Sequence, residues 1–105
     1  MNDIYQVIQA IASLVMCHCI GDYVLQIDFI AKMKCTSKYH LFVHCVLYCV
    51  PFVYVFGYQP WIFLIFFTHY AIDSLKISDP THVSELYDQF LHYLILFIIL
   101  PIIVL

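Results

Sequence analysis

Four pairs of residues that can bind a metal or carry protons recur along this chain, each with a spacing of four. The pairs are His18 with Asp22, His40 with His44, His69 with Asp73, and Asp88 with His92. A spacing of four puts both members of a pair on one face of an α-helix, one turn apart. One such pair carries little information, because a histidine near a helix end is usually a packed or capping residue. Four pairs in four successive segments predict a site that the segments build together.

The chemistry of these side chains favours a metal. Neutral imidazoles and carboxylates are ligands that zinc, manganese and iron accept between facing helices. We therefore predict a divalent cation, with zinc as the first choice and manganese or iron as alternatives. The predicted ligands are His18, Asp22, His40, His44, His69, Asp73, Asp88 and His92. Asp88 is also the candidate catalytic general base. The alternative is a metal-free network of histidine–aspartate hydrogen bonds that serves as a proton relay.

Polar residues beside these pairs are candidates for orienting the ligands or for holding a substrate. They are Gln26, Lys34, Tyr48, Lys76 and Gln89. Amides and hydroxyls commonly fix the orientation of metal ligands. The two lysines would hold an anionic group. For Lys76, pairing with Asp73 or extension towards the membrane surface are alternatives.

The segments that must position these residues are strongly apolar. Apolar residues make up 65% of the 105-residue chain and charged residues only 10%, which is outside the range of soluble globular proteins. Four apolar runs approach the length that crosses a bilayer. We expect one all-α domain over residues 1–105, an integral membrane four-helix bundle of up-down-up-down topology. Its helices cover about residues 4–21, 40–56, 59–76 and 86–105.

The connections between these helices also carry signals. Gly57 and Pro60 predict a tight turn, and residues 79–81 (Asp-Pro-Thr) predict another before the last helix. In the first connection, apolar residues between Leu25 and Met33 recur at helical spacing. This pattern predicts a short helix in the headgroup layer. An ordinary polar connection is the alternative.

Positive charges predict the orientation in the membrane. Lys32, Lys34 and Lys38 fall in the first connection, and Lys76 lies at the start of the third. The positive-inside rule then puts both connections in the cytoplasm and both termini outside. We expect a multi-pass protein of the cytoplasmic (inner) membrane with its site near the cytoplasmic face. Four lysines and a net charge of −3 offer no basic stripe, so nucleic acid is not an expected partner.

The predicted topology places the eight ligands at two depths. Because alternate helices run in opposite directions, like residues come level with one another. The deeper layer would hold His18, His44, His69 and His92. The second layer, one turn nearer the cytoplasm, would hold Asp22, His40, Asp73 and Asp88. Ionisable residues in a bilayer cost at least about 2.5 kcal/mol each, so such a cluster requires mutual pairing or a bound cation.

Two further features concern packing. The five cysteines do not resemble a disulfide framework and are expected to pack as small apolar residues, with a soft-metal role for Cys17 or Cys45 as the alternative. On the first helix, Gln6, Gln9 and Ser13 lie on the face away from His18. They predict a second polar contact, and homodimerisation through this helix is the open interpretation.

The motifs resemble a known family. They are HCIGDYVLQ at residues 18–26, Lys34, LFVHCVLY at 41–48, HYAIDSLK at 69–76, and DQFLH at 88–92. In this order they resemble an uncharacterised family of small bacterial and phage membrane proteins, a domain of unknown function. The resemblance implies that the family's signature positions are His18, Asp22, Gln26, Lys34, His44, His69, Asp73, Lys76, Asp88, Gln89 and His92. His40 and Tyr48 are not among them. A looser similarity links the chain to predicted membrane-bound metal-dependent hydrolases, which carry His-x-x-x-Asp pairs on transmembrane helices.

Three functions fit these observations. The first is a metal-dependent hydrolase that acts at the cytoplasmic membrane face on a lipid-linked phosphate or ester, where the cation activates a water molecule. The second is a non-enzymatic accessory or phage membrane factor with a structural metal or polar core. The third is a transporter of metal ions or protons. It would need a continuous polar path, whereas the outer halves of the last three predicted helices are mostly apolar.

Overall fold

The computed structural model describes residues 2–78 and 84–104, and these residues form helices and short connections with no strand. The long helices are α1 (Asn2–Cys19), α3 (Lys38–Phe56), α4 (Trp61–Ser78) and α5 (Glu85–Val104). A five-residue π-helix, η1 (Ile20–Val24), continues α1, and a short helix, α2 (Asp28–Met33), precedes α3. The predicted all-α class is confirmed. The long helices begin and end close to the predicted residues.

The ends of α3 follow from local chemistry. The Ser37 hydroxyl accepts a hydrogen bond from the backbone N–H of His40 (3.4 Å), which caps the first turn. Gly57 ends the helix with a φ of 78°, a conformation that glycine adopts readily. The turn predicted at Gly57–Pro60 therefore lies between α3 and α4 as expected. The turn predicted at residues 79–81 lies outside the described residues.

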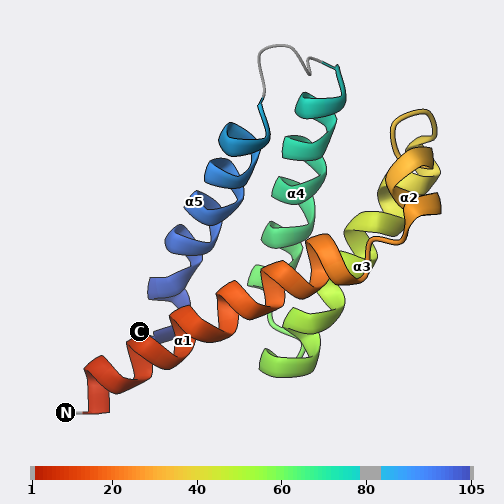
Figure 1. Cartoon of the computed structure of the whole chain (residues 1–105). Coiled ribbons are helices and arrows are strands. Elements are labelled where there is room, and N and C mark those ends of the chain that lie inside the picture. The colour runs from red at the N-terminus through yellow and green to blue at the C-terminus, as the bar shows by residue number, and fades with distance from the viewer. Residues whose placement is uncertain (1, 79–83, 105) are drawn as a thin grey trace.

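The four long helices contact one another in a ring (Figure 1). Helix α1 packs against α3 and α5, and α4 packs against the same two helices. Helices α4 and α5 lie side by side, whereas α1 crosses the others obliquely. Helix α2 packs against α3. The predicted helix in the first connection is therefore present, and its location in the headgroup layer stays a prediction.

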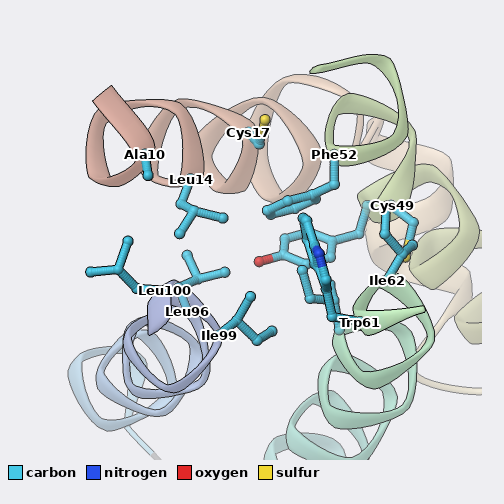
Figure 2. Packing of buried hydrophobic residues seen from close by; sticks show 12 residues of the cluster. Ala10, Leu14, Cys17, Cys49, Phe52, Trp61, Ile62, Leu96, Ile99 and Leu100 are labelled. Atoms are coloured by element: carbon cyan, nitrogen blue, oxygen red, sulfur yellow. The ribbon is translucent and has the colours of Figure 1, made fainter. Parts of the chain in front are cut away.

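The apolar core lies towards one end of the four long helices, and Figure 2 shows how its side chains pack. Leu14 of α1 faces Leu96 and Leu100 of α5, and Phe52 of α3 packs beside Trp61 of α4. Each long helix contributes its other half to a buried polar region. The molecule is thus divided into an apolar half and a polar half, and every long helix crosses both.

The surface of the described residues has the character of a membrane protein. Three helical segments are long and apolar enough to cross a bilayer: Ile4–Val24, Lys38–Phe56 and Glu85–Val104. Helix α4 is similar in length, but its second half carries His69, Asp73 and Lys76, and it does not reach the same apolarity. Four transmembrane helices in a bundle therefore stay a prediction.

Candidate metal centre

Among the described residues, seven polar or charged side chains are buried in the polar half, and each is a predicted ligand. They are His18, Asp22, His44, His69, Asp73, Asp88 and His92. Their residues are at most 6% exposed. Burial of so many ionisable groups is unfavourable unless they bind one another or a cation. The contacts among them therefore decide what the cluster can do.

The closest contacts join two histidines and one aspartate. The Nε2 atoms of His44 and His69 lie 2.9 Å apart. Oδ2 of Asp73 lies 3.1 Å from the His44 Nε2 atom and 3.6 Å from the His69 Nε2 atom. These residues come from α3 and α4, so the two helices together present three ligand atoms to one point.

Asp22 approaches the same point from η1. Its Oδ1 atom lies 3.5 Å from His44 Nε2 and 3.8 Å from His69 Nε2. Ligands bound tetrahedrally to zinc at their usual bond lengths lie about 3.3 Å apart. Among these four ligand atoms, the distances given for five of the six pairs run from 2.9 to 3.8 Å. Each carboxylate oxygen therefore lies close to both imidazole nitrogens, and ligand atoms of Asp22, His44 and His69 all lie within 4.8 Å of one another.

The π-helix explains how Asp22 reaches this position. A wider turn at residues 20–24 interrupts the regular register, so Asp22 contacts His44 and His69 and lies 4.0 Å from His18 Nε2. Single π-turns inside α-helices often mark functional sites. Gly21 permits this arrangement, because a Cβ atom there would lie 2.7 Å from the Tyr48 carbonyl oxygen. Gly21 is the last residue of the first predicted helix, and its position in the sequence does not predict the π-turn.

His92 contributes a further ligand atom. Its Nδ1 lies 2.9 Å from the backbone carbonyl oxygen of Asp88, which can only accept a hydrogen bond, so Nδ1 carries the proton. Its Nε2 is buried, has no hydrogen-bond partner among the described residues, and lies 3.7 Å from Oδ1 of Asp73. Ligand atoms of His69, Asp73 and His92 all lie within 4.8 Å of one another.

His18 is buried in the cluster, but both of its ring nitrogens have protein partners. Its Nδ1 lies 2.7 Å from the Tyr48 hydroxyl, and its Nε2 lies 2.9 Å from Oε1 of Gln89. Since the Gln89 carbonyl oxygen only accepts, Nε2 donates and Nδ1 accepts from the tyrosine. His18 in this arrangement has no lone pair free for a metal. It acts as a link between Tyr48 and Gln89.

Tyr48 and Gln89 both contact residues of the cluster, and their predicted role in orienting metal ligands stays a prediction. The Tyr48 ring stacks on His69, and the Gln89 amide donates to Oδ2 of Asp22 (3.2 Å) and Oδ2 of Asp88 (3.3 Å). The Gln26 amide donates to the backbone oxygen of Asp22 (3.4 Å). Such contacts fix the direction of ligand lone pairs.

His40 is not brought to the cluster. Its ring contacts those of Phe29 and Tyr39, and no hydrogen bond or ion pair among the described residues joins its side chain to the other seven. Cys17 and Cys45 are buried, and neither belongs to a group of converging ligand atoms in the described part of the chain. Their positions agree with the packing role predicted for them.

A pocket of about 460 Å³ reaches the cluster. Its lining residues are Asp22, Tyr23, Gln26, Lys34, Cys35, Asp73, Lys76, Ile77, Glu85, Asp88 and Gln89. Lys34 binds Oδ2 of Asp73 at 3.0 Å. Lys76 pairs with Glu85 and lies 3.7 Å from Oδ2 of Asp88. Among the described residues its carboxylate partners are thus these two, and not Asp73, which was one alternative from the sequence. Three aspartates of the cluster and both candidate lysines thus line one cavity.

Four residues of this pocket were not predicted as site residues: Tyr23, Cys35, Ile77 and Glu85. Glu85 binds Lys76 and accepts a hydrogen bond from the Tyr23 hydroxyl (3.3 Å). A signal for Glu85 was present, because it precedes Gln89 by one helical turn, and the Gln89 amide lies 3.5 Å from it. No comparable signal marked Tyr23.

The second polar face of α1 lies elsewhere. Gln6 and Gln9 are exposed and, with Ser13, line a groove of about 600 Å³ against the end of α5. Their position agrees with the predicted separation from the His18 face. Homodimerisation through this face stays a prediction.

Comparison with known proteins gives one family. A family model described as "Protein of unknown function (DUF3307)" matches residues 10–105, which include every residue of the cluster. No curated protein and no solved structure matches the chain. The match agrees with the resemblance to a domain of unknown function and carries no information on hydrolase activity.

Proposed function

The chain belongs to the DUF3307 family, whose function is unknown, and we propose that it is a membrane-embedded, metal-dependent hydrolase. His44, His69 and Asp73 bind a divalent cation, with zinc as the first choice. Asp22 lies at the fourth position, where it binds the cation or accepts a proton from a water molecule on it. The substrate is a lipid-linked phosphate or another ester at the membrane surface.

One observation carries this proposal: four buried ligand atoms from three elements lie close together, with each imidazole nitrogen within 3.8 Å of both carboxylate oxygens. Two of them are carboxylate oxygens and two are imidazole nitrogens, which is a donor set that suits zinc, manganese and iron. The metal-free alternative must satisfy the same atoms by hydrogen bonds.

The pocket supports a catalytic role. It is lined by Asp22 and Asp73, so a substrate can approach the cation from one side. A catalytic metal site needs such an open side, whereas a structural site is enclosed by protein ligands. The cation would polarise the substrate oxygen and supply hydroxide from water at neutral pH. Asp88 lines the same pocket, and its Oδ1 has no hydrogen-bond partner among the described residues, which suits a general base or a further ligand.

The location of the lysines supports the choice of an anionic substrate. Lys34, which follows α2, and Lys76, near the end of α4, both line the pocket. By the positive-inside rule this end faces the cytoplasm, which puts both termini outside the inner membrane. The outward side chains Phe63 and Phe67 of α4 are 70% and 64% exposed, which supports α4 as a fourth transmembrane helix.

Metal analysis tests the proposal. The protein is purified in mild detergent, loaded with zinc, freed of excess metal, and analysed for metal per chain by elemental mass spectrometry. We expect one equivalent in the wild type, none in His69→Ala or Asp73→Ala, and one in His40→Ala, the matched control outside the cluster. Hydrolysis of p-nitrophenyl phosphate and of phosphatidic acid in vesicles is then measured. A wild type that stays folded and binds no divalent metal refutes the proposal.

A structural metal is the second candidate. Four converging protein atoms would fill a tetrahedral shell, as structural zinc sites require. Metal binding that raises thermal stability, without hydrolysis of any phosphate or carboxylic ester tested, would favour this role. Transport is less well supported, because the apolar half, with Leu14, Phe52 and Ile99, closes the bundle beyond the cluster.

A further inference from the structure

Two atoms beside the proposed cation, Nε2 of His92 and Oδ1 of Asp73, are both hydrogen-bond acceptors and lie next to each other. Nδ1 of His92 donates to the Asp88 carbonyl oxygen, which leaves the Nε2 lone pair directed into the cluster. The nearest carboxylate contact of Nε2 is Oδ1 of Asp73, at 3.7 Å. A doubly protonated imidazole would donate to that oxygen, but 3.7 Å is too long for such a bond. The pair is therefore arranged to receive a cation.

Asp73 can bind one cation beside His44 and His69 and a second beside His92, because its two oxygens contact different partners. Oδ2 contacts the Nε2 atoms of His44 and His69, whereas Oδ1 contacts Nε2 of His92. A carboxylate that binds one metal through each oxygen bridges them. Enzymes of phosphoryl chemistry often hold two cations about 3.5–4 Å apart in this way. Asp88 precedes His92 by one turn, and its Oδ1, which is unpartnered among the described residues, lies 3.7 Å from the protonated Nδ1 of His92 and so on the other side of the ring.

The charges of the pocket limit when a second cation can bind. Lys76 and Glu85 pair at the rim and cancel each other. Inside, the carboxylates of Asp22, Asp73 and Asp88 oppose the single ammonium group of Lys34, which leaves two negative charges. The first divalent cation neutralises them. A second brings two uncompensated positive charges into a buried region, which is unfavourable unless an anion of matching charge accompanies it.

We propose that Asp73 bridges two divalent cations, that Nε2 of His92 holds the second, and that this second cation binds together with a phosphate dianion. The inference rests on the proposed function, since the first cation must be in place. It names the substrate class as phosphate monoesters, whose dianionic group matches the charge of the second cation. Carboxylic esters are neutral and do not supply this compensation.

Metal stoichiometry with and without phosphate tests the inference. Zinc-loaded wild type, freed of excess metal, is dialysed against a fixed low zinc concentration with or without inorganic phosphate, and zinc per chain is measured. We expect one equivalent without phosphate and two with it. His92→Ala should hold one equivalent in both conditions, because it keeps the first position. His40→Ala should behave as the wild type. Circular dichroism of His92→Ala checks that its helices are intact.

A second arm identifies the source of the phosphate group. Wild type in phosphatidylcholine vesicles is compared with wild type in vesicles that also contain phosphatidic acid. A rise to two equivalents with both sources supports a site that binds the phosphate group itself, and a rise with phosphatidic acid alone supports a lipid headgroup.

The outcomes separate the two proposals. A count of one under every condition overturns the second cation and leaves the first intact. A second equivalent that also appears in His92→Ala overturns the assignment to His92. Two equivalents in the wild type without phosphate overturn the coupling to the anion. A wild type that binds no zinc overturns the inference together with the proposed function.

Discussion

The ring of Tyr48 lies flat against the ring of His69, with centroids 3.8 Å apart and planes inclined by 9°. The same tyrosine donates its hydroxyl hydrogen to His18. One side chain of α3 therefore fixes a ligand on α4 through its face and a linking histidine on α1 through its oxygen. A substitution that removes only the hydroxyl is therefore expected to act differently from one that removes the whole ring.

Tyr48→Phe should retain the metal with reduced affinity. The stacked ring remains, but His18 loses the donor to its Nδ1 and no longer holds Gln89 as firmly. Loss of an orienting contact of this kind commonly lowers metal affinity about 10–100-fold. Zinc titration against a competing chelator measures the change. An affinity equal to that of the wild type would show that the hydroxyl has no part in orienting the site. Tyr48→Ala should also lower thermal stability, because it removes a buried ring.

Gly21→Ala should destabilise the protein and weaken the metal site together. The added Cβ would lie 2.7 Å from a backbone oxygen of α3, which cannot move without shifting the helix, and overpacking of this kind typically costs about 1–3 kcal/mol. Because Asp22 lies in the same π-turn, its approach to His44 should also change.

Gly57→Ala is the matched control for this substitution. Gly57 has a positive φ but no atom within 4 Å of an added Cβ, so alanine there should cost about 1–2 kcal/mol through backbone strain alone. Thermal unfolding and zinc titration are measured on both variants. An equal loss of zinc affinity in the two would refute the link between the π-turn and the site.

Lys34→Ala should strengthen cation binding and weaken phosphate binding. The ammonium group contacts the same Asp73 oxygen that faces His44 and His69, so it competes electrostatically with a cation there. We expect the zinc affinity to rise about tenfold, since a like charge this close costs on the order of 1–4 kcal/mol. Lys32→Ala, on the exposed side of α2, should change neither affinity. Isothermal titration with zinc and then with phosphate gives both values.

Metal removal should lower the stability of the wild type. A ligand that binds only the folded state at 100 times its dissociation constant adds about 2.7 kcal/mol to the free energy of unfolding. Thermal unfolding in detergent with zinc and with a chelator should therefore differ, and His69→Ala should show no such difference. Identical unfolding curves for the wild type in both conditions would favour a metal-free polar core.

The helices and most of the cluster could be predicted from spacing because the physics is local. An interval of four fixes a shared helical face, and alternating directions bring His44 level with His69. His18 illustrates what spacing cannot supply. Its partners Tyr48 and Gln89 lie 30 and 71 residues away, and only their approach in the fold shows that both its nitrogens are used. The π-turn at Asp22 likewise depends on the close packing of Gly21 against α3. His40 also precedes a cluster residue, His44, by four positions, but its ring lies beside those of Phe29 and Tyr39 and not in the cluster.

Because the apolar half and the polar half lie at opposite ends of the long helices, the two ends of the molecule differ. Apolar side chains from all four long helices fill one half, whereas the pocket lies in the polar half, so a substrate that enters this pocket is expected to leave by the same opening. A lipid substrate would have to present its headgroup from one leaflet, and the matching lipid of the opposite leaflet would be out of reach. In a sealed vesicle, the fraction of substrate consumed would then report how the protein is oriented.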